Sequence, residues 1–164
     1  MKKTKIILTT ILILILTLFF IRLFSERQLD DLTIGIECEE ELIKKSDVLY
    51  VIPSFNETNI SEEKGWCSRI LNFNKELAMH GVYHTYKEFG EKRNELYVSK
   101  GKEIFTECFG YEPTKFKPPN LGWTNENNWM KKDFEIDLRF NQIFHKTYHC
   151  NDTGVFRNRL IDFF

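Results

Sequence analysis

The N-terminal segment constrains this chain most, because an apolar run of its length does not fit the core of a small soluble domain. Basic residues at the start are followed by an uninterrupted run of apolar and hydroxyl side chains from 6 to 21, which continues as far as Phe24. A run of this length enters a membrane. We therefore expect an N-terminal transmembrane segment at 1–24 and one modest domain at 25–164, about 140 residues long.

The flanks of this segment predict its orientation. No small-x-small cleavage site follows it, so we expect an uncleaved signal anchor that crosses the membrane once. Lys2, Lys3 and Lys5 outnumber Arg22 and Arg27, and the positive-inside rule then keeps the N-terminus in the cytoplasm and the domain outside. A cleaved signal peptide, which would release a secreted domain, is the alternative.

Composition narrows the possible partners of the exported domain. The chain has 23 basic and 24 acidic residues and no basic patch, so nucleic acid is not an expected partner. Outside the cytoplasm its four cysteines are expected to form disulfides, and their spacing lacks the C-x-x-C pattern of a zinc knuckle. Three pairings are possible for these cysteines, which are Cys38, Cys67, Cys108 and Cys150.

Strand and helix patterns alternate along the remainder of the chain. Strands are predicted at 47–55, 114–119 and 134–140, and 78–84 is predicted to be a strand or the end of one. Helices are predicted at 61–79, 94–111 and 124–132, the first with Ser61 as a possible N-cap. This β-α-β-α-β-α-β order favours a parallel sheet or barrel. The functional residues of such a fold lie at the C-terminal ends of the strands.

Two histidines stand at one such strand end. In "LAMHGVYH", His80 ends a predicted strand and His84 follows one short turn later, so both imidazoles can reach one metal ion. Two histidines usually bind a divalent metal together with a carboxylate, and adjacent Asp30 and Asp31 supply candidates. Each pattern has an ordinary alternative, since H-x-x-x-H pairs occur by chance on surfaces and Asp-Asp pairs are often solvated or cap helices.

The order of these motifs is more specific than any one of them. Asp-Asp comes first, then a strand ending in "VIP", then "HGVYHTYKEF" with Glu88, then "FKPP" with Lys117 and Pro118, and then a late histidine. This set, over roughly residues 28 to 150, resembles the polysaccharide deacetylase family, in particular its divergent membrane or exported branch. Lys117 stands where typical members have arginine.

The resemblance implies a distorted, minimal (β/α) barrel that binds a divalent metal through Asp31, His80 and His84. Zinc is the first expectation for this ion, with cobalt, nickel, manganese or iron also compatible. Asp30 would act as the catalytic base and would be held by Lys117. His149, preferred over His145 as the late histidine, would act as the acid.

Three further residues receive supporting roles from the same resemblance. Pro118 and His145 are expected near the site. Glu88 either supports the site or forms a surface ion pair at the start of a helix.

The function predicted from this resemblance is metal-dependent hydrolysis of N- or O-acetyl groups on a cell-surface polysaccharide. Its partners are then an acetylated glycan and the membrane. Two alternatives remain at this stage. One is an inactive deacetylase-like barrel that binds glycan or metal, and the other is a non-haem iron oxygenase, whose ligands would be expected on a double-stranded β-helix.

Overall fold

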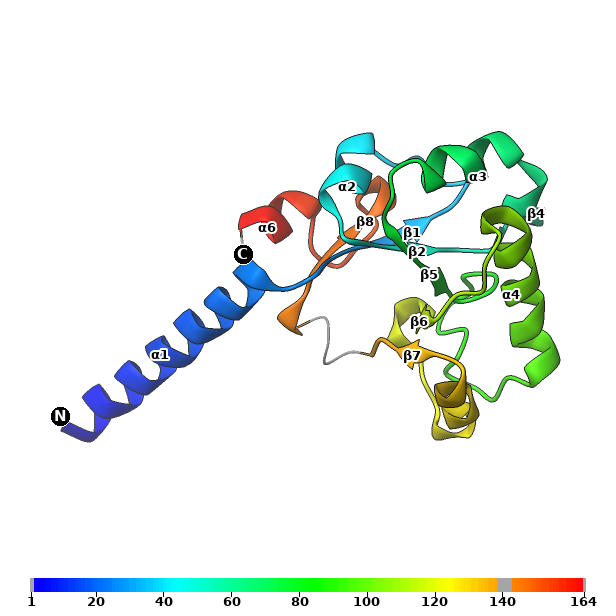
Figure 1. Cartoon of the computed structure of the whole chain (residues 1–164). Coiled ribbons are helices and arrows are strands. Elements are labelled where there is room, and N and C mark those ends of the chain that lie inside the picture. The colour runs from blue at the N-terminus through cyan, green and yellow to red at the C-terminus, as the bar shows by residue number, and fades with distance from the viewer. Residues whose placement is uncertain (1, 139–142, 164) are drawn as a thin grey trace.

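A computed structural model describes residues 2–138 and 143–163 of the chain. Its N-terminal helix α1 (Lys2–Phe24) projects away from a domain built on one parallel sheet (Figure 1). Among the described residues α1 is the one helix long and apolar enough to cross a membrane, by length and composition. A membrane span and a signal sequence both fit this helix.

The main sheet has six strands in the order β7-β6-β5-β2-β1-β8, and every neighbouring pair is parallel. Its strands are β1 (Arg27–Leu32), β2 (Val48–Val51), β5 (Glu76–His80), β6 (Lys115–Lys117), β7 (Glu135–Ile136) and β8 (Lys146–His149). A separate two-stranded ribbon is made of β3 (Ser54–Phe55) and β4 (Thr58–Asn59). The predicted α/β class with a mostly parallel sheet is confirmed.

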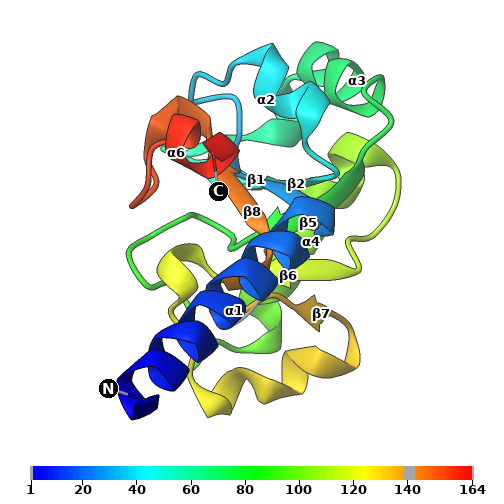
Figure 2. The same cartoon turned by 90° about the vertical axis from the view of Figure 1, so that its left-hand side faces the viewer.

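Helices connect these strands. The α-helices of the domain are α2 (Glu40–Lys45), α3 (Lys64–Leu71), α4 (Glu95–Phe109) and α6 (Asn158–Phe163). Short 3₁₀ turns are η1 (Ile60–Glu62), η2 (Pro119–Leu121), η3 (Asn125–Lys132) and η4 (Cys150–Asp152). In Figure 2, α1 and α6 lie on the viewer's side of the domain.

The longest of these domain helices, α4, has recognisable signals at both ends. The side chain of Asn94 accepts a hydrogen bond from the backbone N–H of Tyr97, which satisfies one free donor of the first turn. Gly110 ends the helix in the left-handed conformation, with φ of 82°, which glycine adopts without steric cost.

The two faces of the sheet differ in chemistry. Side chains alternate along each strand, so Leu29 and Met79 join the apolar core beneath α3 and α4. The opposite side carries buried polar groups, among them Gln28, Asp30 and Lys117. A buried polar face needs internal partners, and this face is where the candidate site lies.

Several predicted elements differ from the structure in extent or type. The strands predicted at 47–55, 78–84 and 114–119 are β2, β5 and β6, and their bounds are Val48–Val51, Glu76–His80 and Lys115–Lys117. The helix predicted at 61–79 ends at Leu71, because a turn that includes left-handed Asn74 leads into β5. Ser61 lies in η1, and the residue that precedes α3 is Glu63. The helix predicted at 124–132 is 3₁₀, and of the strand predicted at 134–140, residues 139 and 140 lie outside the described part.

Two disulfides close the domain, Cys38–Cys150 and Cys67–Cys108. The expectation of disulfides is thereby met, and one of the three possible pairings is selected. Cys67–Cys108 joins α3 to α4 on the apolar side of the sheet. Cys38–Cys150 joins the segment after β1 to the residue that follows His149.

Replacing Cys67 and Cys108 by serine should lower the stability of the domain without changing the site. The bond closes a loop with a sequence separation of 41, for which chain entropy predicts about 4 kcal/mol of stabilisation. Urea unfolding of the oxidised wild type and the double variant measures this difference. Equal unfolding midpoints and slopes would contradict it.

Candidate metal centre

An irregularity in β1 brings two consecutive aspartates to the same cleft. In a regular strand Asp30 and Asp31 would point to opposite faces. The register of β1 against β2 shifts between Leu29 and Leu32, and Asp31 has a φ of 65°. Such a bulge redirects a side chain, and a non-glycine residue in this conformation is strained, which is typical of functional sites.

The histidine pair lies at the C-terminal end of β5. His80 is the last residue of the strand, and left-handed Gly81 starts the turn that carries His84. The Nδ1 of His80 lies 3.0 Å from the carbonyl oxygen of Lys117, to which it donates as a protonated nitrogen. This bond orients the ring and leaves Nε2 as the atom that faces Asp31.

Both histidines converge on a single carboxylate oxygen. Oδ1 of Asp31 lies 3.3 Å from Nε2 of His80 and 2.8 Å from Nε2 of His84. Ligand atoms bound tetrahedrally to zinc lie about 3.4 Å apart, so these separations are close to those of a metal site. The ligand atoms of all three residues lie within 4.8 Å of one another, and the cluster can hold a divalent ion.

The second oxygen of Asp31 faces a different set of partners. Oδ2 lies 3.0 Å from Nδ1 of His149 and accepts a hydrogen bond of 2.7 Å from the Thr153 hydroxyl. Burial raises the pKa of Asp31, but its hydrogen bonds with His149, His80 and His84 lower this pKa more, to well below the ordinary value. Asp31 is therefore ionised at neutral pH, as a metal ligand must be.

The carboxylate of Glu88 fixes the turn between the two histidines. It accepts backbone N–H bonds of 3.0 to 3.2 Å from Val82, Tyr83 and His84, and a bond of 2.7 Å from the Tyr97 hydroxyl. Glu88 is only 1 % exposed. The surface ion-pair alternative for Glu88 is therefore wrong, because its partners are the backbone donors of the histidine turn.

Beneath the site, Asp30 is paired with a fully buried lysine. Nζ of Lys117 lies 2.9 Å from Oδ1 of Asp30 and donates to Oε1 of Gln28 at 2.8 Å. Asp137 is also close, at 3.9 Å from the same Nζ, and accepts bonds from Gln28 and the Tyr50 hydroxyl. Burial, followed by the charge of Asp137, raises the pKa of Tyr50, so its hydroxyl remains a donor.

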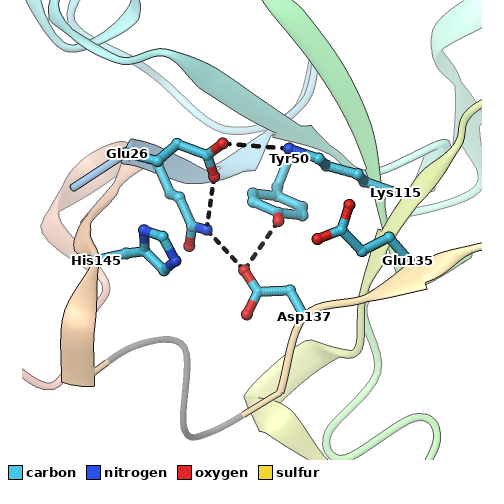
Figure 3. Close-up of a pocket in the computed structure, with 7 residues that line it drawn as sticks. Glu26, Tyr50, Lys115, Glu135, Asp137 and His145 are labelled. Carbon is cyan, nitrogen blue, oxygen red and sulfur yellow. Dashed lines mark hydrogen bonds and ion pairs between the residues drawn. The ribbon is translucent and has the colours of Figure 1, made fainter.

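A small pocket of about 80 Å³ adjoins this polar layer, and Tyr50 and Asp137 are among the side chains that line it (Figure 3). His145 lies on the wall of this pocket, near Asp137 and Glu26, and also lines the larger cleft. The structure thus places His145 near the site, whereas His149 is the late histidine that contacts Asp31.

Three residues of the site, Gln28, Asp137 and Thr153, were not predicted from the sequence. Strand alternation could have identified Gln28, because residues two apart on a strand share a face with each other, as Gln28 does with Asp30. The tertiary structure brings Asp137 and Thr153 to the site, and no local sequence pattern indicates them.

The site opens into a cleft of about 930 Å³. The predicted residues Asp30, Asp31, His80 and His84 line it together with Pro118. His149 lines the same cleft, so the structure brings the residues predicted as base, ligands and acid to one space.

Neither a protein-family model nor a curated protein matches the chain. Solved structures that resemble it include a CE4 family pseudoenzyme from Bacillus anthracis, with 12% sequence identity and a TM-score of 0.44, over 56% of this chain and 32% of that one. A polysaccharide deacetylase from Bacillus cereus has 18% identity and a TM-score of 0.41, over 54% and 44% of the two chains. A Xyl-CE4 domain of a multidomain xylanase from the hindgut metagenome of Trinervitermes trinervoides has 13% identity and a TM-score of 0.41, over 68% and 57%.

These structures are of the deacetylase type that the sequence motifs resemble. This chain spans about a third of the length of the first of them, 32%. With TM-scores below 0.5 and identities below 25%, the likeness lies in the general arrangement of the chain and carries no conclusion about activity. The geometry of the site is what indicates a function.

The full chain, purified in detergent and loaded with zinc, should hold about one ion, and the variant His80→Ala/His84→Ala should hold none. The variant loses two of three ligands. His145→Ala is a matched control that removes a nearby histidine outside the ligand set. Mass spectrometry of the native protein counts the ions, and a folded wild type without metal would refute the site.

Glu88→Gln should weaken zinc binding about 10- to 100-fold, because the turn that positions His84 loses a charged acceptor. Glu91→Gln is the control, since Glu91 is an exposed carboxylate paired with Arg93 at the surface. Competition with a zinc-binding dye measures both affinities. Equal affinities in the two variants would show that Glu88 does not position the site.

Proposed function

We propose that this chain is a membrane-anchored hydrolase that uses a divalent metal to remove acetyl groups from a glycan. The observation that carries the proposal is the convergence of His80 and His84 on one oxygen of Asp31. Beside this ligand set lies a carboxylate with a buried cation, and on the other oxygen of Asp31 lies a third histidine. Metal ligands, a base and an acid in one cleft are what metal-assisted hydrolysis requires.

Asp31, His80 and His84 would hold the ion. A divalent metal in such a set supplies Lewis acidity and a bound water of lowered pKa. The residues of this chain contribute the geometry, because Glu88 holds the histidine turn and the Lys117 carbonyl orients the His80 ring. An open side toward the cleft leaves room for water and substrate.

Asp30 would accept the proton of the attacking water. Lys117 binds one of its oxygens, which compensates the buried negative charge and leaves the other oxygen for the proton. Gln28 and Asp137 hold Lys117 in turn. The base is therefore fixed by a layer of buried side chains, as proton transfer at a defined position requires.

His149 would protonate the leaving group. Its Nδ1 is engaged with Asp31, so Nε2 is the nitrogen left for the substrate. The oxygen of water forms a bond to the acetyl carbon, the bond from that carbon to the sugar nitrogen or oxygen breaks, and the leaving atom takes the proton of His149. The products are acetate and a free amine or hydroxyl on the sugar.

A glycan is proposed as the acetyl carrier because of the motif resemblance. The oxygenase alternative loses support, since its ligands were expected on a double-stranded β-helix, whereas these lie on a parallel sheet with connecting helices. The inactive-barrel alternative predicts metal binding without acetate release, which a direct assay separates from hydrolysis.

The metal-loaded protein should release acetate from acetylated chito-oligosaccharide or acetylated xylan, and Asp30→Asn should reduce the rate roughly 10²- to 10⁴-fold while it keeps its metal. Asp133→Asn, which changes an exposed aspartate, is the control. Enzymatic assay of acetate measures the rates. Metal-loaded wild type that releases no acetate would favour the inactive barrel. Full activity in Asp30→Asn would exclude Asp30 as the base.

A further inference from the structure

One wall of the cleft is made by the membrane helix itself. Leu18 and Arg22 of α1 line the same cleft as Asp31 and the two histidines. Arg22 is tied to the domain, since its Nη1 donates a 2.8 Å hydrogen bond to the carbonyl oxygen of Ile143. The cleft is therefore continuous with the surface of α1.

Large apolar side chains line the same cleft between η4 and α6. Val155 is 97% exposed and Phe156 is 64% exposed, and both line the cleft with Leu160. Exposed apolar groups that gather beside a binding cleft indicate contact with an apolar partner. Figures 1 and 2 both show α6 and α1 on the same side of the domain.

With α1 spanning a membrane, as the proposed function has it, chain geometry places this cleft at the membrane surface. Leu18 lies six residues before the end of α1, roughly 9 Å along the helix axis, so a helix that spans the bilayer puts Leu18 at or below its surface. Asp30 follows Phe24 by six residues, and even an extended chain would carry it at most roughly 20 Å from the helix end. The cleft is then close to the membrane surface, and a polysaccharide in solution would have to reach it there.

We infer that the substrate is an acetylated sugar carried on a lipid of the same membrane. This inference rests on the proposed function and names the substrate class of that site. The sugar lies at Asp31, His80 and His84, and the lipid chain lies in the apolar groove between Leu18 and Phe156. The sugar of such a molecule is polar, like the residues of the site, and its lipid chain is apolar, like the side chains that line the groove.

The test uses the full chain, loaded with zinc, in phosphatidylcholine vesicles. The probe is an N-acetylglucosaminyl lipid with a photoreactive diazirine in its alkyl chain, and the comparison probe is a diazirine phosphatidylcholine. Mass spectrometry of the irradiated protein locates the labelled peptides. We expect the sugar lipid to label the segment 150–163 at least tenfold more than the comparison probe does.

Competition makes this result specific without any variant. Unlabelled sugar lipid should remove the labelling, and the same molar amount of the soluble methyl glycoside should not.

Val155→Ser/Phe156→Ser should reduce the labelling at least tenfold, whereas Leu96→Ser, at an exposed leucine of α4, should leave it unchanged. Zinc content reports the folding of each variant.

Equal labelling by both probes, or equal competition by the soluble glycoside, would overturn the inference. Acetate release from the sugar lipid is measured in the same vesicles and reports the proposed function separately. Specific labelling without acetate release would support the lipid substrate class and contradict hydrolysis. Acetate release without specific labelling would support hydrolysis and reject the lipid groove.

Discussion

The carboxylate of Asp31 is the interaction on which the rest of the site depends. Each of its oxygens serves a different part of the fold, with His80 and His84 on one and His149 and Thr153 on the other. A buried carboxylate is costly unless it is fully paired, and these side chains supply the pairing. Burial lowers the pKa of His80, but its bond to Asp31 and the charge of Asp30 raise this pKa more, so protons compete for the position that a metal would take.

Much of this arrangement could be predicted from the sequence, because parallel strands bring their C-terminal ends to one edge. His80, Lys117 and His149 each end a strand. The strand pattern predicted such a position for His80, whereas Lys117 and His149 were assigned to the site only by the family that the motifs resemble. The extent of the elements was less predictable. The 61–79 segment reads as one amphipathic helix, but the left-handed turn at Asn74 divides it, and a conformation of that kind follows from tertiary packing.

Glu88 was predicted as a possible supporting residue, but the contacts that the supporting residues make could not be predicted from the sequence. The Glu88 carboxylate lies among backbone donors of its own loop, which a pattern of residue types does not reveal. Asp137 reaches Gln28 across a sequence separation of 109. The pairing of Cys38 with Cys150, one of three possible pairings, likewise depends on a contact between distant segments and could not be predicted. That disulfide holds the residue after His149 against the segment that follows β1, so a covalent link lies near the hydrogen bond between His149 and Asp31.

Lys117 stands where typical members of the polysaccharide deacetylase family, which the sequence motifs resemble, have arginine. Arginine would bind a carboxylate with a planar fork, whereas an ammonium group acts as a point charge with three donors. Lys117 is fully buried, and its Nζ lies among Asp30, Gln28 and Asp137 and 4.6 Å from the centre of the Tyr50 ring. These partners surround the ammonium from several directions, which suits its tetrahedral shape. A buried ion pair contributes little to stability compared with apolar packing, so the physical effect of this arrangement is to hold Asp30 in one orientation beneath the cleft. Lys117 therefore holds Asp30 in the way that the base of the proposed hydrolysis would require, and a lysine at this position is compatible with that proposal.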